Sequence, residues 1–163
     1  EYLDSAETGA RVVTPWARNL EKLGIELKFR PVDFALYQQR LRGFDFDIIS
    51  IAYGGTPNPG AEYADLFGSQ AAKTEDSGNF AGVSSPAVDA LLARMVNARI
   101  KPDFLAACRA LDRVISHSHY LIPQWSATTH RMVYNAWRLD RPKDMPPYAA
   151  GEAWAIDTWW SKQ

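Results

Sequence analysis

The chain of 163 residues has one cysteine, Cys108, and almost no net charge. A single cysteine excludes an internal disulfide framework and a zinc site built on several thiolates. Lys and Arg number 18 against 19 for Asp and Glu, so the basic excess typical of a nucleic-acid-binding protein is missing. No segment approaches the roughly 18 successive apolar residues of a membrane-spanning helix.

Aromatic residues are abundant instead, at 12% of the chain. The hydrophobic and charged fractions of 47% and 23% are those of an ordinary globular protein. Three of the six tryptophans, Trp154, Trp159 and Trp160, lie within the last ten residues. We expect so aromatic a tail to pack against another surface.

A strand-helix-strand unit is predicted between residues 25 and 52. Apolar and charged residues alternate over 25–30, which indicates a strand with one solvated face. Asp33 can cap a short helix that Gly43 ends. The nearly continuous apolar run 46–52 predicts a strand buried on both faces, as in a parallel sheet. The fold class is therefore α/β, with a right-handed crossover.

The remaining segments are mostly helical by their apolar spacing. Thr14-Pro15 is expected either to cap a helix over 13–23 or, if that helix begins earlier, to lie inside it with a kink. The other expected segments are helices over 62–67, over 86–96 and from Pro102, a strand over 120–126 that Pro123 limits, and an irregular stretch over 138–151. Cys108 lies on an apolar helical stripe, which favours a small buried side chain.

The loop after the second predicted strand is the candidate binding site. Ligands of open α/β sheets bind beyond the carboxyl ends of the strands, and a Gly/Pro-rich segment begins there. Backbone amides and an aromatic side chain in this loop can meet a ligand. The candidate ligand-binding residues from the loop are Tyr53, Gly54, Gly55, Thr56 and Asn58. Asn79 and Trp125 are added from segments expected to border the loop.

Catalytic and metal-binding patterns are weak. Asp45 and Asp47 share a face if the strand already begins at Asp45, but they lie at its amino end, opposite the expected ligand edge. No His-Glu-x-x-His spacing supports a metal site around His117, His119 or His130. We predict no metal and no cofactor, and keep a small hydrolase using Asp45/Asp47 or a histidine as an alternative.

Seven short motifs occur in a characteristic order from about Val13 to about Pro142. They are Leu20-x-x-Leu-Gly-Ile25, Val32-Asp33 to Phe46-Asp47, Pro59-Gly60-x-Glu62, Gly78-Asn79-Phe80-x-Gly82, Pro86-x-Val-Asp89-x-Leu-Leu92, Ala110-Leu-Asp-Arg-Val-Ile115 and Tyr120-x-Ile-Pro-x-Trp125. With these motifs in this order, the chain resembles the carboxy-terminal part of the family 5 extracellular solute-binding proteins of ABC importers. The details are most similar to the oligopeptide-receptor branch related to the microcin C importer receptor.

This resemblance implies a lobe of the type II periplasmic-binding-protein fold, with a mixed, mostly parallel sheet flanked by helices and an irregular C-terminal tail. Residues 1–137 are expected to form the C-terminal lobe of a two-lobed receptor, and residues 138–163 to return to the first lobe. The implied protein is periplasmic and not an enzyme. It closes on an oligopeptide-like solute and presents it to an ABC permease. Surface meant for the first lobe is expected to make the isolated lobe self-associate.

One departure from the family concerns the peptide's amino terminus. In the peptide receptors of this family an Asp in the loop after the central strand pairs with that group, whereas residues 54–58 contain no carboxylate and Thr56 is nearest the position. Because a charge-assisted bond to an ammonium is then lost, we expect no strict preference for free amino termini. A carbohydrate receptor, which predicts solvent-facing tryptophan rings along one groove, stays a further alternative.

Overall fold

The computed structural model describes residues 1–54, 58–124, 132–144 and 153–162. The chain divides into two compact units, Glu1–Leu121 and Ile122–Gln163. Each unit is described by itself. No helix in the described ranges combines the length and the apolar character needed to cross a membrane.

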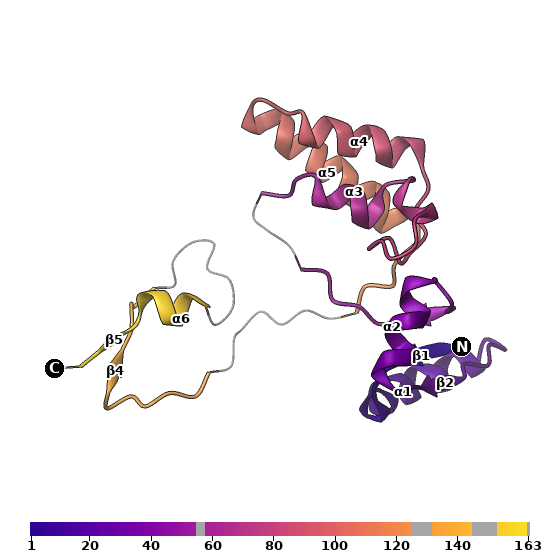
Figure 1. Cartoon of the computed structure of the whole chain (residues 1–163), viewed down its shortest axis with the longest axis horizontal. Coiled ribbons are helices and arrows are strands. Elements are labelled where there is room, and N and C mark those ends of the chain that lie inside the picture. The colour runs from indigo at the N-terminus through magenta and orange to yellow at the C-terminus, as the bar shows by residue number, and fades with distance from the viewer. Residues whose placement is uncertain (55–57, 125–131, 145–152, 163) are drawn as a thin grey trace. The chain divides into compact units, whose positions relative to one another are not determined.

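A three-stranded parallel sheet opens the first unit (Figure 1). Its strands are β1 (Tyr2–Asp4), β2 (Phe29–Pro31) and β3 (Ile48–Ile49), in the order β2-β1-β3. Helix α1 (Ala10–Glu21), after the 3₁₀ turn η1 (Glu7–Gly9), leads from β1 to β2, and α2 (Phe34–Arg42) leads from β2 to β3. The predicted α/β class with a parallel sheet and flanking helices is confirmed.

The strands are shorter than the sequence pattern predicts. β2 begins only at Phe29, and Ile25 is half exposed. The expectation of a strand over 46–52 buried on both faces is wrong, because β3 has two residues and Ile51 is 43% exposed. Among the described residues β3 pairs with β1 alone, so one of its edges receives no ladder hydrogen bonds and pairing ends early. The central strand is β1, which the sequence pattern did not reveal.

The helix boundaries follow local chemistry closely. The Oδ1 atom of Asp33 accepts a hydrogen bond from the backbone N–H of Leu36 at 3.0 Å, and α2 ends at Gly43, so both predicted signals are confirmed. Of the two alternatives for the first helix, the earlier start is observed. Helix α1 begins at Ala10, which leaves Pro15 inside it.

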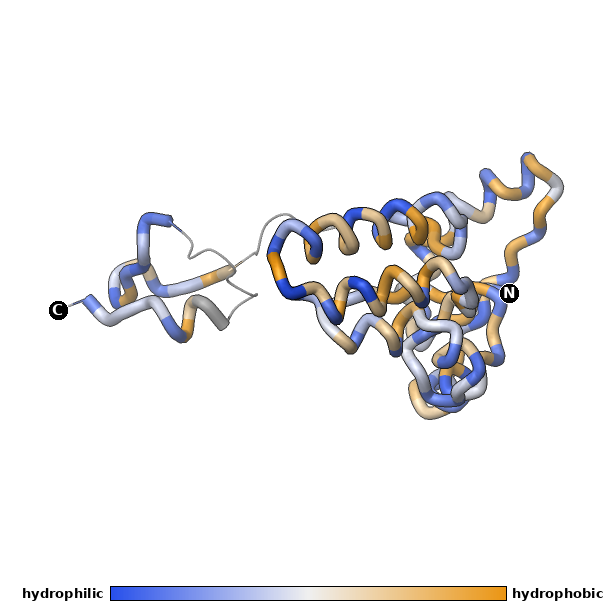
Figure 2. Tube along the Cα trace, turned by 90° about the horizontal axis from the view of Figure 1, so that it is seen from above, coloured by the Kyte–Doolittle hydropathy of each residue, from blue (hydrophilic) through white to orange (hydrophobic). Residues whose placement is uncertain are grey.

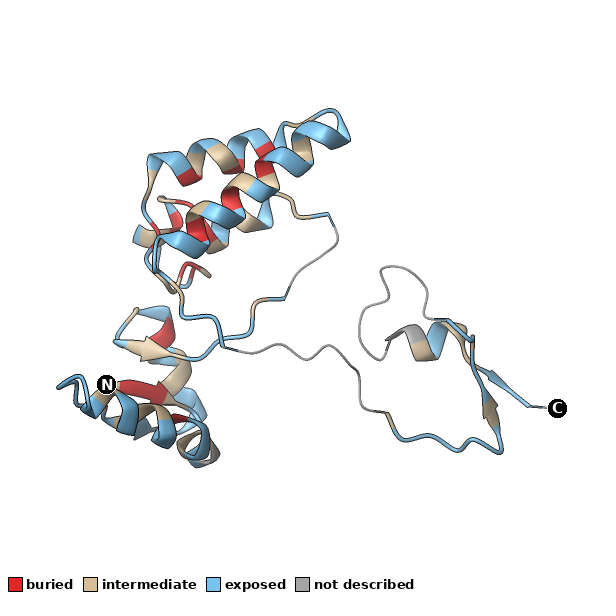
Figure 3. Cartoon of the chain, turned by 180° about the vertical axis from the view of Figure 1, so that it is seen from behind, coloured by how far each residue is buried: buried red, intermediate tan, exposed pale blue. Residues whose placement is uncertain are grey.

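Three helices form the larger hydrophobic core. They are α3 (Glu62–Phe67), α4 (Pro86–Val96) and α5 (Lys101–His117), with the 3₁₀ turn η2 (Ala71–Lys73) between the first two. The buried positions lie on the facing sides of α4 and α5 (Figure 3). The core residues are Phe67, Val83, Val88, Leu92, Met95, Ala107, Leu111 and Ile115. The side chain of Cys108 packs against this core and is partly buried. This burial raises the pKa of its thiol.

The second unit contains short regular elements where the sequence predicts irregular chain. Strands β4 (Leu139–Asp140) and β5 (Trp160–Ser161) pair antiparallel, and α6 (Ala153–Thr158) precedes β5. The Tyr134 and Trp159 rings meet edge to face at 4.6 Å, whereas Trp137 is 91% exposed. In the segment predicted as a strand over 120–126, residues 121–124 are not a strand, and 125–126 lie outside the described residues.

Candidate functional site

The chain leaves β3 at the carboxyl edge of the sheet and leads into the predicted binding loop. Tyr53 is half-buried, and its ring lies 5.6 Å from that of Phe67, tilted by 44°. Gly54 is exposed, and a Cβ atom added there would meet no atom within 4 Å. Asn58 is also exposed. The start and the end of the loop are therefore open enough for a ligand to reach the backbone.

Three of the predicted site residues lie outside the described part of the chain. Gly55 and Thr56 belong to 55–57, and Trp125 belongs to 125–131, both outside the described residues. Their assignment to the site stays a prediction.

The Tyr53 hydroxyl is the chemically distinctive atom of the loop. It is buried and has no hydrogen-bond partner among the described residues. Burial raises the pKa of this phenol, so at neutral pH the group is uncharged and able to donate a hydrogen bond. A buried polar group without a partner is destabilising, and such groups are few in native structures.

Asn79 lies in a different environment from the exposed loop positions. Its side chain is almost fully buried, at 1% exposed. The Nδ2 atom donates to the carbonyl oxygens of Gly68 at 3.0 Å and Val83 at 2.9 Å, and Oδ1 accepts from Val83 N–H at 2.8 Å. These bonds give Asn79 a structural role in the loop between α3 and α4. Its contact with a solute stays a prediction.

Two carboxylates hold the same loop in place. Asp65 Oδ2 accepts from the Gly78 N–H at 3.0 Å, and Asp89 Oδ1 accepts from the Ser69 N–H at 2.9 Å. The hydrogen bond from Ser69 holds the pKa of Asp89 below its usual value. Gly78, Asn79 and Asp89 belong to the motifs that carry the family resemblance, so at these positions the motifs stabilise a buried loop.

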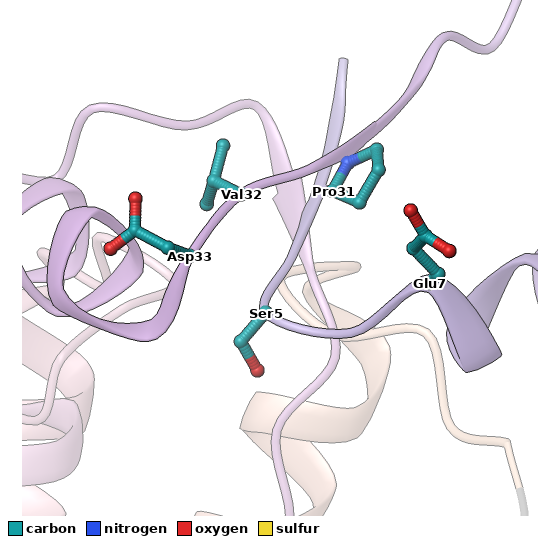
Figure 4. A pocket seen from close by; sticks show the side chains of 5 residues that line it. All are labelled: Ser5, Glu7, Pro31, Val32 and Asp33. Atoms are coloured by element: carbon teal, nitrogen blue, oxygen red, sulfur yellow. The ribbon is translucent and has the colours of Figure 1, made fainter.

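A hollow of about 300 Å³ lies where the chain leaves β1 and β2 (Figure 4). Its lining residues are Ser5, Glu7, Pro31, Val32 and Asp33. Because the sheet is parallel, this hollow is at the same carboxyl edge as the Tyr53 loop. Sequence reasoning missed it, since β1 was not predicted. A three-residue strand has too few positions to show a period.

The carboxylates of the alternative hydrolase lie at the amino end of β3. Their side chains are 74% and 75% exposed for Asp45 and Asp47. Asp45 Oδ2 accepts from Arg40 Nε at 2.9 Å. Both carboxylates therefore lie in solvent, at the edge of the sheet opposite the loop after β3.

The histidines form no catalytic group in the described part of the chain. His117 is exposed, with Nδ1 at 2.8 Å from the Arg113 carbonyl oxygen. His119 is exposed in a left-handed backbone conformation, and His130 lies outside the described residues. Within the described ranges, no three His, Cys, Asp or Glu side chains are grouped so that they could hold a metal ion.

Comparison with known proteins relates the chain to proteins named for binding. No family model matches it. It is 40% identical over 162 residues to the probable peptide-binding protein YejA of Agrobacterium fabrum, covering 99% of this chain and 26% of that protein. It is 33% identical to the peptidoglycan-binding protein YepA of the same organism, covering 92% and 24%. The uncharacterized protein YejA of Escherichia coli is 30% identical, covering 98% and 26%. The chain spans about a quarter of the length of these curated relatives.

Proposed function

We propose that the chain is the C-terminal lobe of a periplasmic solute-binding receptor, which binds oligopeptide-like solutes between two lobes and delivers them to an ABC permease. The observation that carries the proposal is the similarity to the peptide-binding protein YejA, which extends over 99% of the chain. The carboxyl edge of a parallel sheet, with an open loop after β3, is consistent with a binding role. No covalent step is part of the proposal.

The solute is held mainly by hydrogen bonds from the loop after β3. The proposed contacts are the backbone at Gly54 and Gly55 and the side chains of Thr56 and Asn58, with the ring of Tyr53 as an apolar wall. A peptide offers carbonyl oxygens to such donors along its whole length. Trp125 is proposed as an apolar wall, and Asn79 reaches the solute only if its present hydrogen bonds rearrange.

Residues 1–137 form the lobe in this proposal, and 138–163 return to the first lobe. Solute binding shifts an equilibrium between open and closed forms, and the permease recognises the closed form. The exposed Trp160 of the tail belongs to the surface expected to pack on the first lobe. The isolated lobe is then expected to self-associate, which size-exclusion chromatography at several concentrations measures.

Gly54 offers the sharpest test of the site. Because a Cβ atom there meets no neighbour, Gly54→Leu is expected to fold normally and to obstruct the approach of a solute. The receptor that carries this chain is titrated by calorimetry with defined tri- to pentapeptides, free or acetylated at the amino terminus. We expect Gly54→Leu and Asn58→Ala to weaken binding at least tenfold, and the remote variant Asn97→Ala to leave it unchanged. Unchanged affinity in both site variants would remove the loop from the proposal.

A peptide that carries an amino sugar is the second candidate solute. The relative named as peptidoglycan-binding is 33% identical to this chain, and the 91% exposed Trp137 offers a face on which a sugar ring can stack. Competition between a free pentapeptide, the same peptide linked to an amino sugar, and the sugar alone separates the candidates. Binding of the sugar alone favours a carbohydrate receptor, and binding of only the free peptide excludes this second candidate.

A further inference from the structure

The turn between α4 and α5 exposes two aliphatic side chains at the end of the helical hairpin. Val96 is 49% exposed and Ile100 is 56% exposed. Hydrophobic and hydrophilic positions adjoin each other along this turn (Figure 2). Neither residue belongs to the hydrophobic core, and neither belongs to the candidate site.

Three cations flank these residues in the sequence. Arg94, Arg99 and Lys101 are all exposed. None of them forms an ion pair with a residue in the described part of the chain. No Asp or Glu occurs between Ala90 and Pro102, and a single carboxylate, Asp103, follows in the first turn of α5. The end of the hairpin therefore carries local positive charge on a protein whose formal net charge is −1.

Two residues at the start of α5, Ile100 and Lys101, do not favour a helix start, although Pro102 and Asp103 beside them do. Ile100 occupies the N-cap position with φ −124° and ψ 146°, the backbone conformation of a cap, but its side chain makes no capping hydrogen bond. Ser, Thr, Asp and Asn are strongly preferred there. Lys101 places a positive charge at the positive end of the helix dipole. Residues that disfavour the local structure in which they occur are often found at functional positions.

We propose that this hairpin end, composed of Arg94, Val96, Arg99, Ile100 and Lys101, docks on the surface of an anionic phospholipid membrane. The cations meet lipid phosphates, and the two aliphatic side chains enter the interfacial region. The hollow beside the ends of β1 and β2 is lined by other segments. An aliphatic turn at the end of a helical hairpin suits a yielding lipid interface better than a rigid protein pocket. This inference does not rest on the proposed solute-binding function.

Vesicle sedimentation of the purified protein tests the proposal. The vesicles contain phosphatidylcholine alone, or phosphatidylcholine and phosphatidylglycerol in equal parts, at low ionic strength. We expect binding only to the anionic vesicles, and release as added salt shortens the screening length. The triple variant Arg94→Gln/Arg99→Gln/Lys101→Gln is expected to bind about a hundredfold more weakly. The loss of each cation is expected to reduce the affinity about fivefold, and the three losses multiply.

The matched control is Arg11→Gln/Arg18→Gln/Lys22→Gln. It changes the net charge equally at three exposed cations on α1 and its end. We expect the control to bind like the original protein. Equal weakening in both triple variants would mean attraction to net charge alone, and would overturn the proposal. Absence of binding to anionic vesicles would also overturn it, and would leave an acidic protein surface as the partner to consider.

Ile100→Ser separates membrane docking from folding. A serine at this N-cap can accept a hydrogen bond from the backbone N–H of Asp103, so we expect the melting temperature to rise. The same variant is expected to bind anionic vesicles more weakly, because an inserting side chain is lost. A variant that is more stable yet binds less cannot be explained by misfolding. Unchanged vesicle binding by Ile100→Ser would remove the aliphatic part of the proposal.

Discussion

The side chain of Asn79 bonds to both backbone groups of Val83, accepting from its N–H at 2.8 Å and donating to its carbonyl oxygen at 2.9 Å. A third bond, to the carbonyl of Gly68, ties the end of α3 to the start of the segment before α4. Val83 is completely buried, so no solvent can replace Asn79 as its partner.

Replacing Asn79 by alanine should therefore destabilise the protein. The change leaves three buried backbone groups without their partner, and we expect a loss of about 3 kcal/mol in the free energy of unfolding. Urea denaturation followed by circular dichroism measures it. Asn97→Ala is the control, because that side chain makes an exposed hydrogen bond to Ala93, and should change stability by less than about 0.5 kcal/mol. Equal losses in the two variants would contradict the structural role of Asn79.

Asp89 should make stability depend on pH in the acidic range. The hydrogen bond from Ser69 lowers the pKa of Asp89 in the folded protein. Its contribution is therefore fully present above the unfolded pKa of about 4 and is lost as the pH falls through the lower folded value. The difference in unfolding free energy between the original protein and Asp89→Asn should shrink as the pH falls below about 4. A difference that stays constant with pH would argue against this bond.

Tyr53 and Tyr63 both contact the ring of Phe67, at 5.6 Å and 6.0 Å, but only Tyr53 has a buried hydroxyl without a partner among the described residues. Tyr53→Phe keeps the ring and removes that hydroxyl, so we expect a gain of about 1 kcal/mol in stability. Tyr63→Phe should change little. Thermal unfolding of both variants measures the comparison, and a clear loss for Tyr53→Phe would show that its hydroxyl has a partner.

The raised pKa of Tyr53 predicts that the free energy of unfolding falls in alkaline solution. Burial raises the pKa of Tyr53 above the usual tyrosine value of about 10, so the contribution of its neutral form is present below the unfolded pKa and is lost as the pH rises through the folded value. Tyr53→Phe should therefore resist alkaline unfolding better than the original protein. Denaturant midpoints between about pH 9 and pH 11 measure this; parallel pH curves would contradict it.

Pro15 should limit the stability of α1. It lies six residues into a helix that begins at Ala10, and it has no N–H to donate to the carbonyl of Arg11. Because the position is exposed, Pro15→Ala should raise the free energy of unfolding by about 1 to 3 kcal/mol. Denaturant titration measures the change, and Ala17→Ser on the same helix is a control expected to stay close to the original protein. No gain from Pro15→Ala would mean that the helix bends around the proline without loss.

Signals that depend on neighbours in the sequence were the reliable ones. The Asp33 cap, the end of α2 at Gly43, the bounds of α3 and the start of α4 at Pro86 are all observed as predicted. Each depends on atoms within one helical turn. For the site, strand order alone predicted the loop after β3, and that assignment stays a prediction.

The parts that sequence reasoning missed depend on distant residues. The apolar run 46–52 looks buried on both faces, but its burial depends on strand pairing, and β3 has one described neighbour. Asn79 looks like any polar loop residue until Gly68 and Val83 surround it. The hollow beside Ser5 and Asp33 exists only because β1 enters the sheet between β2 and β3.

The sequence alone determined the α/β class and the bounds of several helices, such as α3 and the start of α4, because helix periodicity, caps and glycine stops act over a few residues. Tertiary structure decided which strand is central, how far each strand extends and which polar side chains are available to a ligand. Those properties follow from hydrogen bonds and burial between segments far apart in the chain, such as Tyr2 beside Phe29 and Ile48, and no local pattern encodes them.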